Sequence, residues 1–161
     1  MVSRLNRSVI VYVSYSGNTE EMAHFIRQYV ESYGIEVDLY DVTAHIRPID
    51  LSRYDVLFLG TFTWDYGSVP EELEDFLSVV DLTGTEVAFF GSGDTQFGGD
   101  SLYCRALKQL KATYGSKWNL LKVEQSPRGY QEERIYHWVK EVVEDVYQIK
   151  KSKNIRTALS E

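Results

Sequence analysis

The sequence predicts one α/β domain built on a doubly wound, five-stranded parallel sheet with helices on both faces. Short runs of β-branched and aromatic residues alternate along the chain with stretches whose apolar residues recur at helical spacing. Repeated strand–crossover–strand units of this kind produce a parallel sheet covered on both sides. A length of 161 residues suits one ordinary hydrophobic core. We therefore expect a single domain over residues 1–161, with its core at about 8–147.

The strands are expected where short apolar runs occur, at 8–13, 35–42, 54–62, 87–91 and 119–124. Helical spacing begins at Asn18 and stops at Gly34, begins again at Pro70, and covers about 101–114 and 132–147. Glu20 and Glu21 occupy the first turn of the first helix, where the helix dipole favours anions. Pro70 suits a helix start because its missing N–H has no partner there in any case. The chain therefore has the order βαββαβαβα.

Two segments are expected to depart from this regular pattern. Residues 43–53 stand where a crossover helix would fall, but the stretch around Pro48 is a poor helix former, so this connection is predicted to be irregular. The basic tail at 148–161 loses apolar periodicity after Ile149 and is expected to fray or dock loosely.

Charge is distributed unevenly along the chain. The net charge of −7 argues against a nucleic-acid-binding protein, which needs Lys and Arg facing the phosphates. Between Arg53 and Arg105 there is no basic residue, whereas ten carboxylates occur in that stretch. Such a field attracts a partner with a basic rim, although an acidic surface also serves solubility.

Cysteine and histidine content gives no support to metal or nucleophilic chemistry. Cys104 is the lone cysteine, and three scattered histidines offer no zinc-site spacing. No residue has the setting of a general base or nucleophile, so we expect no catalytic and no metal-binding residues. The apolar run from Val9 to Val13 is too short for a signal-peptide core or a membrane span. We expect a cytoplasmic monomer.

The loop after the first strand, Ser14 to Thr19, has the composition of an anion-binding turn. In doubly wound sheets the ligand lies outside the carboxyl ends of the strands, and this loop leads from such an end straight into a helix. Hydroxyls and helix N-terminal N–H groups can hold a phosphate, and Gly17 permits close approach of the main chain. Alternatively, these residues simply cap the helix.

Motifs that are missing from this loop indicate which class of phosphate ligand it could bind. No Lys or Arg lies between Arg7 and Arg27, and the loop has no GxxxxGK[ST] motif, which disfavours a nucleotide triphosphatase. A dinucleotide fingerprint fails too, because the GxG at Gly91 and Gly93 has no third glycine and follows the wrong strand. A monophosphate therefore fits best.

Two further loops leave the same sheet edge and carry aromatic residues. Trp64 and Tyr66 follow the third strand, where an exposed indole can stack on a flat conjugated ring or fold over the adjacent helix. The loop from Gly91 to Asp100 has four glycines and Phe97, which allows it to turn toward a ligand or to act as a flexible connection. Together the three loops offer a phosphate site and two aromatic walls.

With these loops the sequence resembles the flavodoxins, the bacterial FMN-binding proteins. Their T/S-x-T-G-N-T phosphate loop is matched from Ser14 to Thr19, with Ser16 replacing Thr. Their T-W and G-D flavin loops are matched at Thr63–Trp64 and Gly93–Asp94. The resemblance covers about 8–147 and implies strand order 2-1-3-4-5.

The resemblance implies FMN as cofactor, bound by residues of all three loops. The expected FMN-binding residues are Ser14, Tyr15, Ser16, Gly17, Asn18, Thr19, Phe62, Thr63, Trp64, Asp65, Tyr66, Gly67, Ser92, Gly93, Asp94, Phe97 and Gly98. Two positions depart from the usual family pattern. Asp65 follows the Trp where many flavodoxins have Gly, and Phe97 stands where many have Tyr, so which peptide contacts the flavin N5 is left open.

The function implied is that of a low-potential one-electron carrier rather than an enzyme. Its partners would be a flavodoxin/ferredoxin–NADP reductase type of donor and a redox enzyme as acceptor, both reached through the acidic face. Two alternatives are kept. The stretch from Gly67 to Leu73 is similar to flavodoxin-like activators of ribonucleotide reductase, and an FMN-dependent quinone reductase would need a nicotinamide site for which the sequence gives no sign.

Overall fold

The computed structural model describes residues 7–44, 49–62, 68–93, 105–124 and 127–160. Its centre is a parallel sheet of five strands, all of them within these ranges: β1 (Arg7–Tyr12), β2 (Glu36–Asp41), β3 (Val56–Phe62), β4 (Val87–Gly93) and β5 (Leu121–Glu124). The order across the sheet is β2-β1-β3-β4-β5. The predicted fold class and strand order are confirmed, and each predicted strand lies within two residues of an observed one at both ends.

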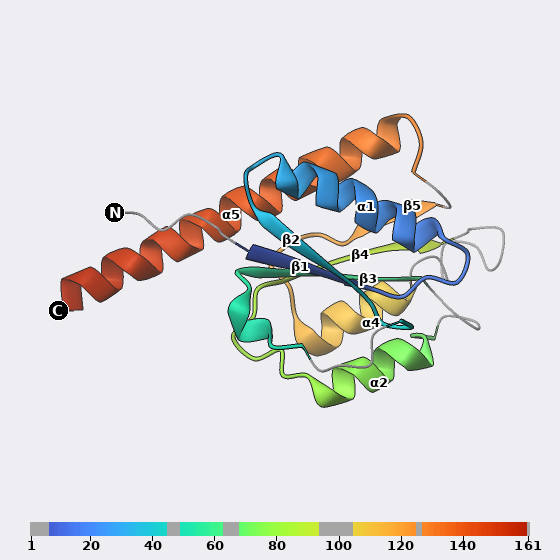
Figure 1. Ribbon diagram of the computed structural model, residues 1–161, viewed down its shortest axis with the longest axis horizontal. Helices are drawn as coiled ribbons and strands as arrows, with labels where there is room; N and C mark the ends of the chain where they lie inside the picture. Colours follow the sequence, from blue (N-terminus) through green and yellow to red (C-terminus); the bar gives the residue numbers. More distant parts are fainter. Residues whose placement is uncertain (1–6, 45–48, 63–67, 94–104, 125–126, 161) are drawn as a thin grey trace.

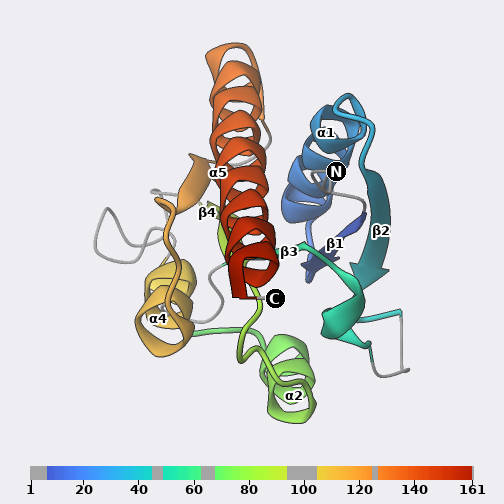
Figure 2. The same cartoon turned by 90° about the vertical axis from the view of Figure 1, so that its left-hand side faces the viewer.

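Helices cover both faces of the sheet, as expected for a doubly wound fold (Figures 1 and 2). Helices α1 (Asn18–Glu31) and α5 (Tyr130–Ser160) lie side by side on one face. Helices α2 (Glu71–Val79) and α4 (Arg105–Tyr114) lie on the other. The predicted start of the α4 segment, at 101–104, lies outside the described residues.

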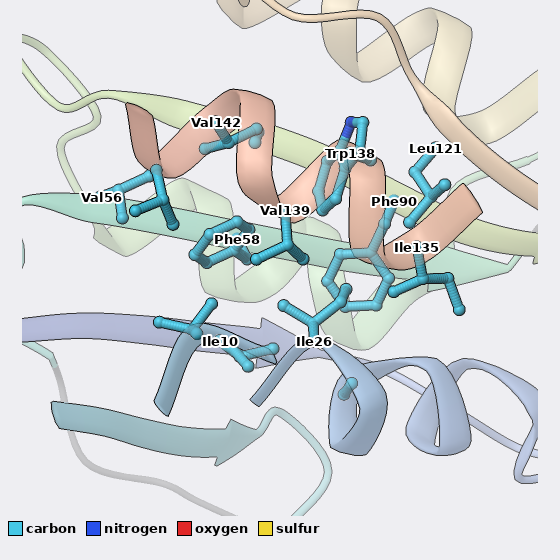
Figure 3. Packing of buried hydrophobic residues seen from close by; sticks show 14 of the residues in the cluster. Ile10, Ile26, Val56, Phe58, Phe90, Leu121, Ile135, Trp138, Val139 and Val142 are labelled. Carbon is cyan, nitrogen blue, oxygen red and sulfur yellow. The ribbon is translucent and has the colours of Figure 1, made fainter. Parts of the chain in front are cut away.

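The strands divide their side chains between two hydrophobic clusters because successive residues of a strand point to opposite faces. Ile10, Phe58 and Phe90 are fully buried beneath α1 and α5 (Figure 3). Neighbouring strand residues such as Val9 and Leu57 belong to the second cluster, under α2 and α4. Both faces of the sheet are apolar, which accounts for the near-continuous apolar runs in the sequence.

Helix α5 is held to the sheet by packing and by two indole hydrogen bonds. The predicted apolar residues of this helix, from Ile135 to Val146, are buried. The Trp138 indole donates to the Asn119 carbonyl at 2.9 Å, and the Trp118 indole donates to Asp145 Oδ2 at 2.9 Å. Each bond joins α5 to the segment that leads into β5, so the edge strand and the helix are fixed together.

The prediction that the last helix ends near Tyr147 was wrong, because α5 continues to Ser160. Figure 1 shows its C-terminal part extending past the sheet. Lys150 Nζ lies 3.0 Å from Asp55 Oδ1, which ties the start of this extension to the segment before β3. Loss of apolar periodicity removes packing but does not remove helix propensity, and Lys, Arg, Ala and Leu are good helix formers. In the described part of the chain, no helix is long and apolar enough to cross a bilayer.

The connection between β2 and β3 is irregular, as predicted. Among its described residues, only Leu51–Arg53 form a helical turn, of the 3-10 type. Asp50 caps this turn by accepting a hydrogen bond from the Ser52 N–H at 3.1 Å. Pro48 lies outside the described residues.

Candidate functional site

The three predicted loops leave neighbouring strands at one edge of the sheet. The register pairs Tyr12 with Gly60 and Phe62 with Ser92, so β1, β3 and β4 end side by side. Because β1 pairs with β2 on one side and β3 on the other, the strand order reverses between β1 and β3. This is the position at which doubly wound sheets bind their ligands.

The turn from β1 into α1 places a left-handed glycine directly before a helix start, which suits an anion. Gly17 precedes the helix with φ +93°, in the left-handed region that other residues rarely adopt. Its N–H donates to Ser14 Oγ at 3.1 Å, which closes the turn. Gly17, the N-cap residue, has no side chain with which to cap the helix. The first-turn N–H groups of α1 therefore stand directly after the carboxyl end of β1, and both interpretations, an anion site and a simple helix cap, stay predictions.

The electrostatic setting of this turn is anionic rather than cationic. Glu20 and Glu21 stand in the first turn of α1, and Glu20 Oε1 lies 3.7 Å from His24 Nε2. An anion here would be held by N–H dipoles and hydroxyls, of which the Ser16 side chain is exposed and that of Ser14 half-buried. These residues fit a phosphate monoester held without a cation.

A buried hydroxyl pair joins the first loop to the third. Thr19 Oγ1 and Ser92 Oγ lie 2.7 Å apart, and the two residues are only 1% and 3% exposed. Each hydroxyl therefore supplies the other with a partner that water cannot replace. Gly91, just before Ser92, has no room for a side chain, because a Cβ would collide with the Thr61 carbonyl oxygen. The chain thus approaches β3 closely where it enters the third loop.

Tyr15 joins the first loop to the segment around the second. Its hydroxyl donates to Glu72 Oε2 at 2.5 Å, and its ring centroid lies 4.7 Å from that of Phe62. The hydrogen bond to Glu72, followed by desolvation, raises the pKa of Tyr15 to about 12. The phenol therefore remains a protonated donor at neutral pH. Sequence reasoning named Tyr15 and Phe62 but missed Glu72, because a contact between residues 57 positions apart leaves no local signal.

The structure brings together nine of the predicted site residues at this edge: Ser14, Tyr15, Ser16, Gly17, Asn18, Thr19, Phe62, Ser92 and Gly93. The other eight lie outside the described residues: Thr63, Trp64, Asp65, Tyr66, Gly67, Asp94, Phe97 and Gly98. Their proposed contacts with a flavin ring therefore stay predictions. Within the described ranges, no cluster of three or more His, Cys, Asp or Glu residues has the arrangement of a metal site.

Comparison with known proteins gives a consistent result. The family model described as flavodoxin matches residues 10–117. "Probable flavodoxin 1" of Bacillus subtilis is 32% identical over 143 residues, which are 87% of this chain and 83% of that protein. "Probable flavodoxin 2" of the same organism is 30% identical over 138 residues, which are 81% of this chain and 89% of that protein. The crystal structure of oxidised flavodoxin 1 from Bacillus cereus superimposes with a TM-score of 0.75 at 31% identity, covering 86% of this chain and 98% of that one.

The buried hydroxyl pair is tested by Thr19→Val, which keeps the shape of the side chain and removes its hydroxyl. Ser92 then loses a buried partner, and we expect the free energy of unfolding to fall by about 1–3 kcal/mol in urea denaturation. Thr19→Val combined with Ser92→Ala is expected to lose less than the sum of the two single changes, because no orphaned hydroxyl remains.

Thr113→Val is the matched control, since the Thr113 hydroxyl bonds the Gln109 carbonyl on an exposed helix surface. This control is expected to change stability by less than about 0.5 kcal/mol. Equal losses in Thr19→Val and Thr113→Val would contradict the assignment of a structural role to the buried pair.

Proposed function

The chain belongs to the flavodoxin family of FMN-containing electron carriers, and we propose that it passes single electrons at low potential between a flavin reductase and an acceptor enzyme. The observation that carries this proposal is the left-handed Gly17 turn before α1, at the place where the strand order reverses. That turn supplies the anion-binding half of an FMN site. The proposed cofactor is one FMN, held without a covalent bond.

The residues proposed to hold the phosphate are those of the first loop. Ser14 and Ser16 would contribute hydroxyls, and the start of α1 would contribute N–H groups at Asn18 and Thr19. The seventeen predicted contacts divide between this phosphate end and a ring end, where Phe62, Ser92 and Gly93 lie at the strand ends. At the ring end, stacking by Trp64 and closure by Phe97 belong to the proposal.

The proposed low potential follows from charge. Bound FMN would supply the redox-active ring, and the chain sets how favourable it is to add negative charge there. Glu20 and Glu21 stand near the phosphate turn, and no Lys or Arg lies between Arg53 and Arg105 to offset the ten carboxylates of that stretch. Uncompensated negative charge beside a partly desolvated site disfavours further electron uptake.

The proposed docking surface for redox partners is the acidic face at the start of α2. Glu71, Glu72 and Glu74 occupy the first turn of this helix, which begins just after the second loop. Glu71 and Glu74 are exposed, so they can attract a basic rim on a partner and orient it toward the loop edge. Such attraction raises the encounter rate and makes it sensitive to salt. We further propose that the protein acts as a monomer in the cytoplasm.

The phosphate turn is tested by Gly17→Ala. An alanine at φ +93° is strained by about 1–2 kcal/mol, and the turn must keep this conformation to bind, so FMN affinity is expected to fall about tenfold. The measurement is fluorescence titration of the apoprotein with FMN.

Gly34→Ala is the matched control, because Gly34 has φ +77°, equally open surroundings, and lies past the other end of α1. It is expected to lower stability by a similar amount and to leave FMN affinity unchanged. If both variants lose affinity equally, the phosphate turn is not the FMN site.

Electron carriage is tested by a coupled assay with FMN-loaded protein, NADPH, a flavodoxin/ferredoxin–NADP reductase and oxidised cytochrome c. Reduction of cytochrome c is expected only when the reductase and this protein are both present, with a rate that falls as salt is added. Glu71→Gln with Glu74→Gln should lower the rate and flatten its salt dependence. The control changes the exposed Glu141 and Glu144 of α5 to Gln. It should leave both the rate and its salt dependence unchanged.

Rapid NADPH oxidation without the reductase would contradict the carrier proposal and favour a flavin-dependent reductase. Inactivity with the reductase, together with tight binding to a ribonucleotide reductase subunit, would favour the activator alternative.

A further inference from the structure

Tyr15 has an arrangement that the phosphate site alone does not require. Tyr15 is 47% exposed. A phosphate-binding loop needs no aromatic group at this position. The hydroxyl and the ring of Tyr15 nevertheless both have partners, Glu72 at 2.5 Å and the Phe62 ring at 4.7 Å.

The two partners of Tyr15 lie on either side of the second loop. Phe62 is the last residue of β3, immediately before the segment 63–67. Glu72 is in the first turn of α2, and this helix begins a few residues after the segment 63–67. One side chain of the phosphate loop therefore contacts both ends of the segment that is proposed to contact the flavin ring.

Stability of the fold does not explain this arrangement. Neither hydrophobic cluster includes Tyr15, and its hydrogen bond to Glu72 is exposed, although Phe62 packs against the cluster under α2 and α4. A hydrogen bond between exposed groups contributes little to folding, whereas it can fix the relative placement of two loops that must act together.

We propose that Tyr15 is a positioning residue, which sets the spacing between the phosphate turn and the start of α2 and so holds the two ends of the flavin loop in register with the phosphate loop. This inference rests on the proposed function, because it assigns Tyr15 a role in FMN binding. It adds to the role predicted from sequence, where Tyr15 was expected to contact FMN itself. The positioning role acts through Glu72 and Phe62.

The role is distinguished from a phosphate contact by comparing FMN with riboflavin, which has no phosphate. Tyr15→Phe removes the hydroxyl and keeps the ring contact with Phe62. If Tyr15 places the flavin loop, the variant binds FMN and riboflavin more weakly by the same factor, about fivefold for one net hydrogen bond. A residue that served only the phosphate would weaken FMN binding and leave riboflavin binding unchanged.

The experiment measures the dissociation constants of both flavins for the wild type, Tyr15→Phe, Glu72→Ala and the double variant. The single changes are expected to weaken binding of both flavins similarly, and the double variant is expected to be no weaker than either, because both remove the same bond. Glu72→Gln keeps an acceptor oxygen and should restore most of the affinity. Asp75→Ala controls for loss of charge on α2, because Asp75 is exposed, and Tyr114→Phe controls for the same change at a tyrosine that is 42% exposed. Both controls should bind as the wild type does.

A second readout uses the apoprotein and needs no flavin. Amide hydrogen exchange in peptides covering 14–19 and 68–73 is expected to be faster in Tyr15→Phe than in the wild type, and unchanged in Tyr114→Phe. Unchanged exchange, wild-type affinity in Tyr15→Phe, or a loss confined to FMN would each overturn the positioning role while the proposed function stands. Failure of the wild type to bind FMN would overturn both.

Discussion

The proposed FMN site depends on one electrostatic constraint, which is that its phosphate would be held at the end of β1 by N–H groups and hydroxyls, because the first loop contains no Lys or Arg. A helix start can meet this requirement only if its first N–H groups are not taken by a capping side chain. Gly17, the residue before α1, adopts φ +93° and has no side chain that could take these groups. The turn follows β1, which lies between β2 and β3 in the parallel sheet, so the carboxyl ends of β3 and then β4 come next along the same edge.

The remaining features of the proposed site follow from holding the phosphate charge with N–H dipoles rather than with Lys or Arg. Because the first loop contains no Lys or Arg, the proposed phosphate would keep its charge and add to the negative field of the ten carboxylates between Arg53 and Arg105. The same field can lower the reduction potential and attract a basic partner, so one distribution of charge serves both parts of the proposed electron transfer. The Thr19–Ser92 and Tyr15–Glu72 contacts then join the loops to one another, one of them buried and the other exposed.

Much of this architecture was predictable because neighbouring residues in the sequence specify it, through their apolar spacing and the composition of the loops. Strand and helix periodicities gave the order of elements, and the buried residues of α5 from Ile135 to Val146 were recognised by their spacing. The composition of the first loop indicated a glycine turn into a helix, which the left-handed φ of Gly17 before α1 confirms, whereas its binding of an anion stays a prediction. The extension of α5 to Ser160 was missed because apolar spacing reports packing, and this part of the helix is largely exposed. Glu72 and the pairing of Thr19 with Ser92 were missed because such contacts depend on tertiary structure.

The central claim, that this chain tunes one FMN for single-electron transfer at low potential, is tested most directly by potentiometric reduction of the FMN-loaded protein under anaerobic conditions, followed by visible absorption. The account predicts two separate one-electron waves, with the second well below the potential of free FMN. A single two-electron wave near the potential of free FMN would contradict it, because the anionic surroundings of the site would then have no effect on electron uptake.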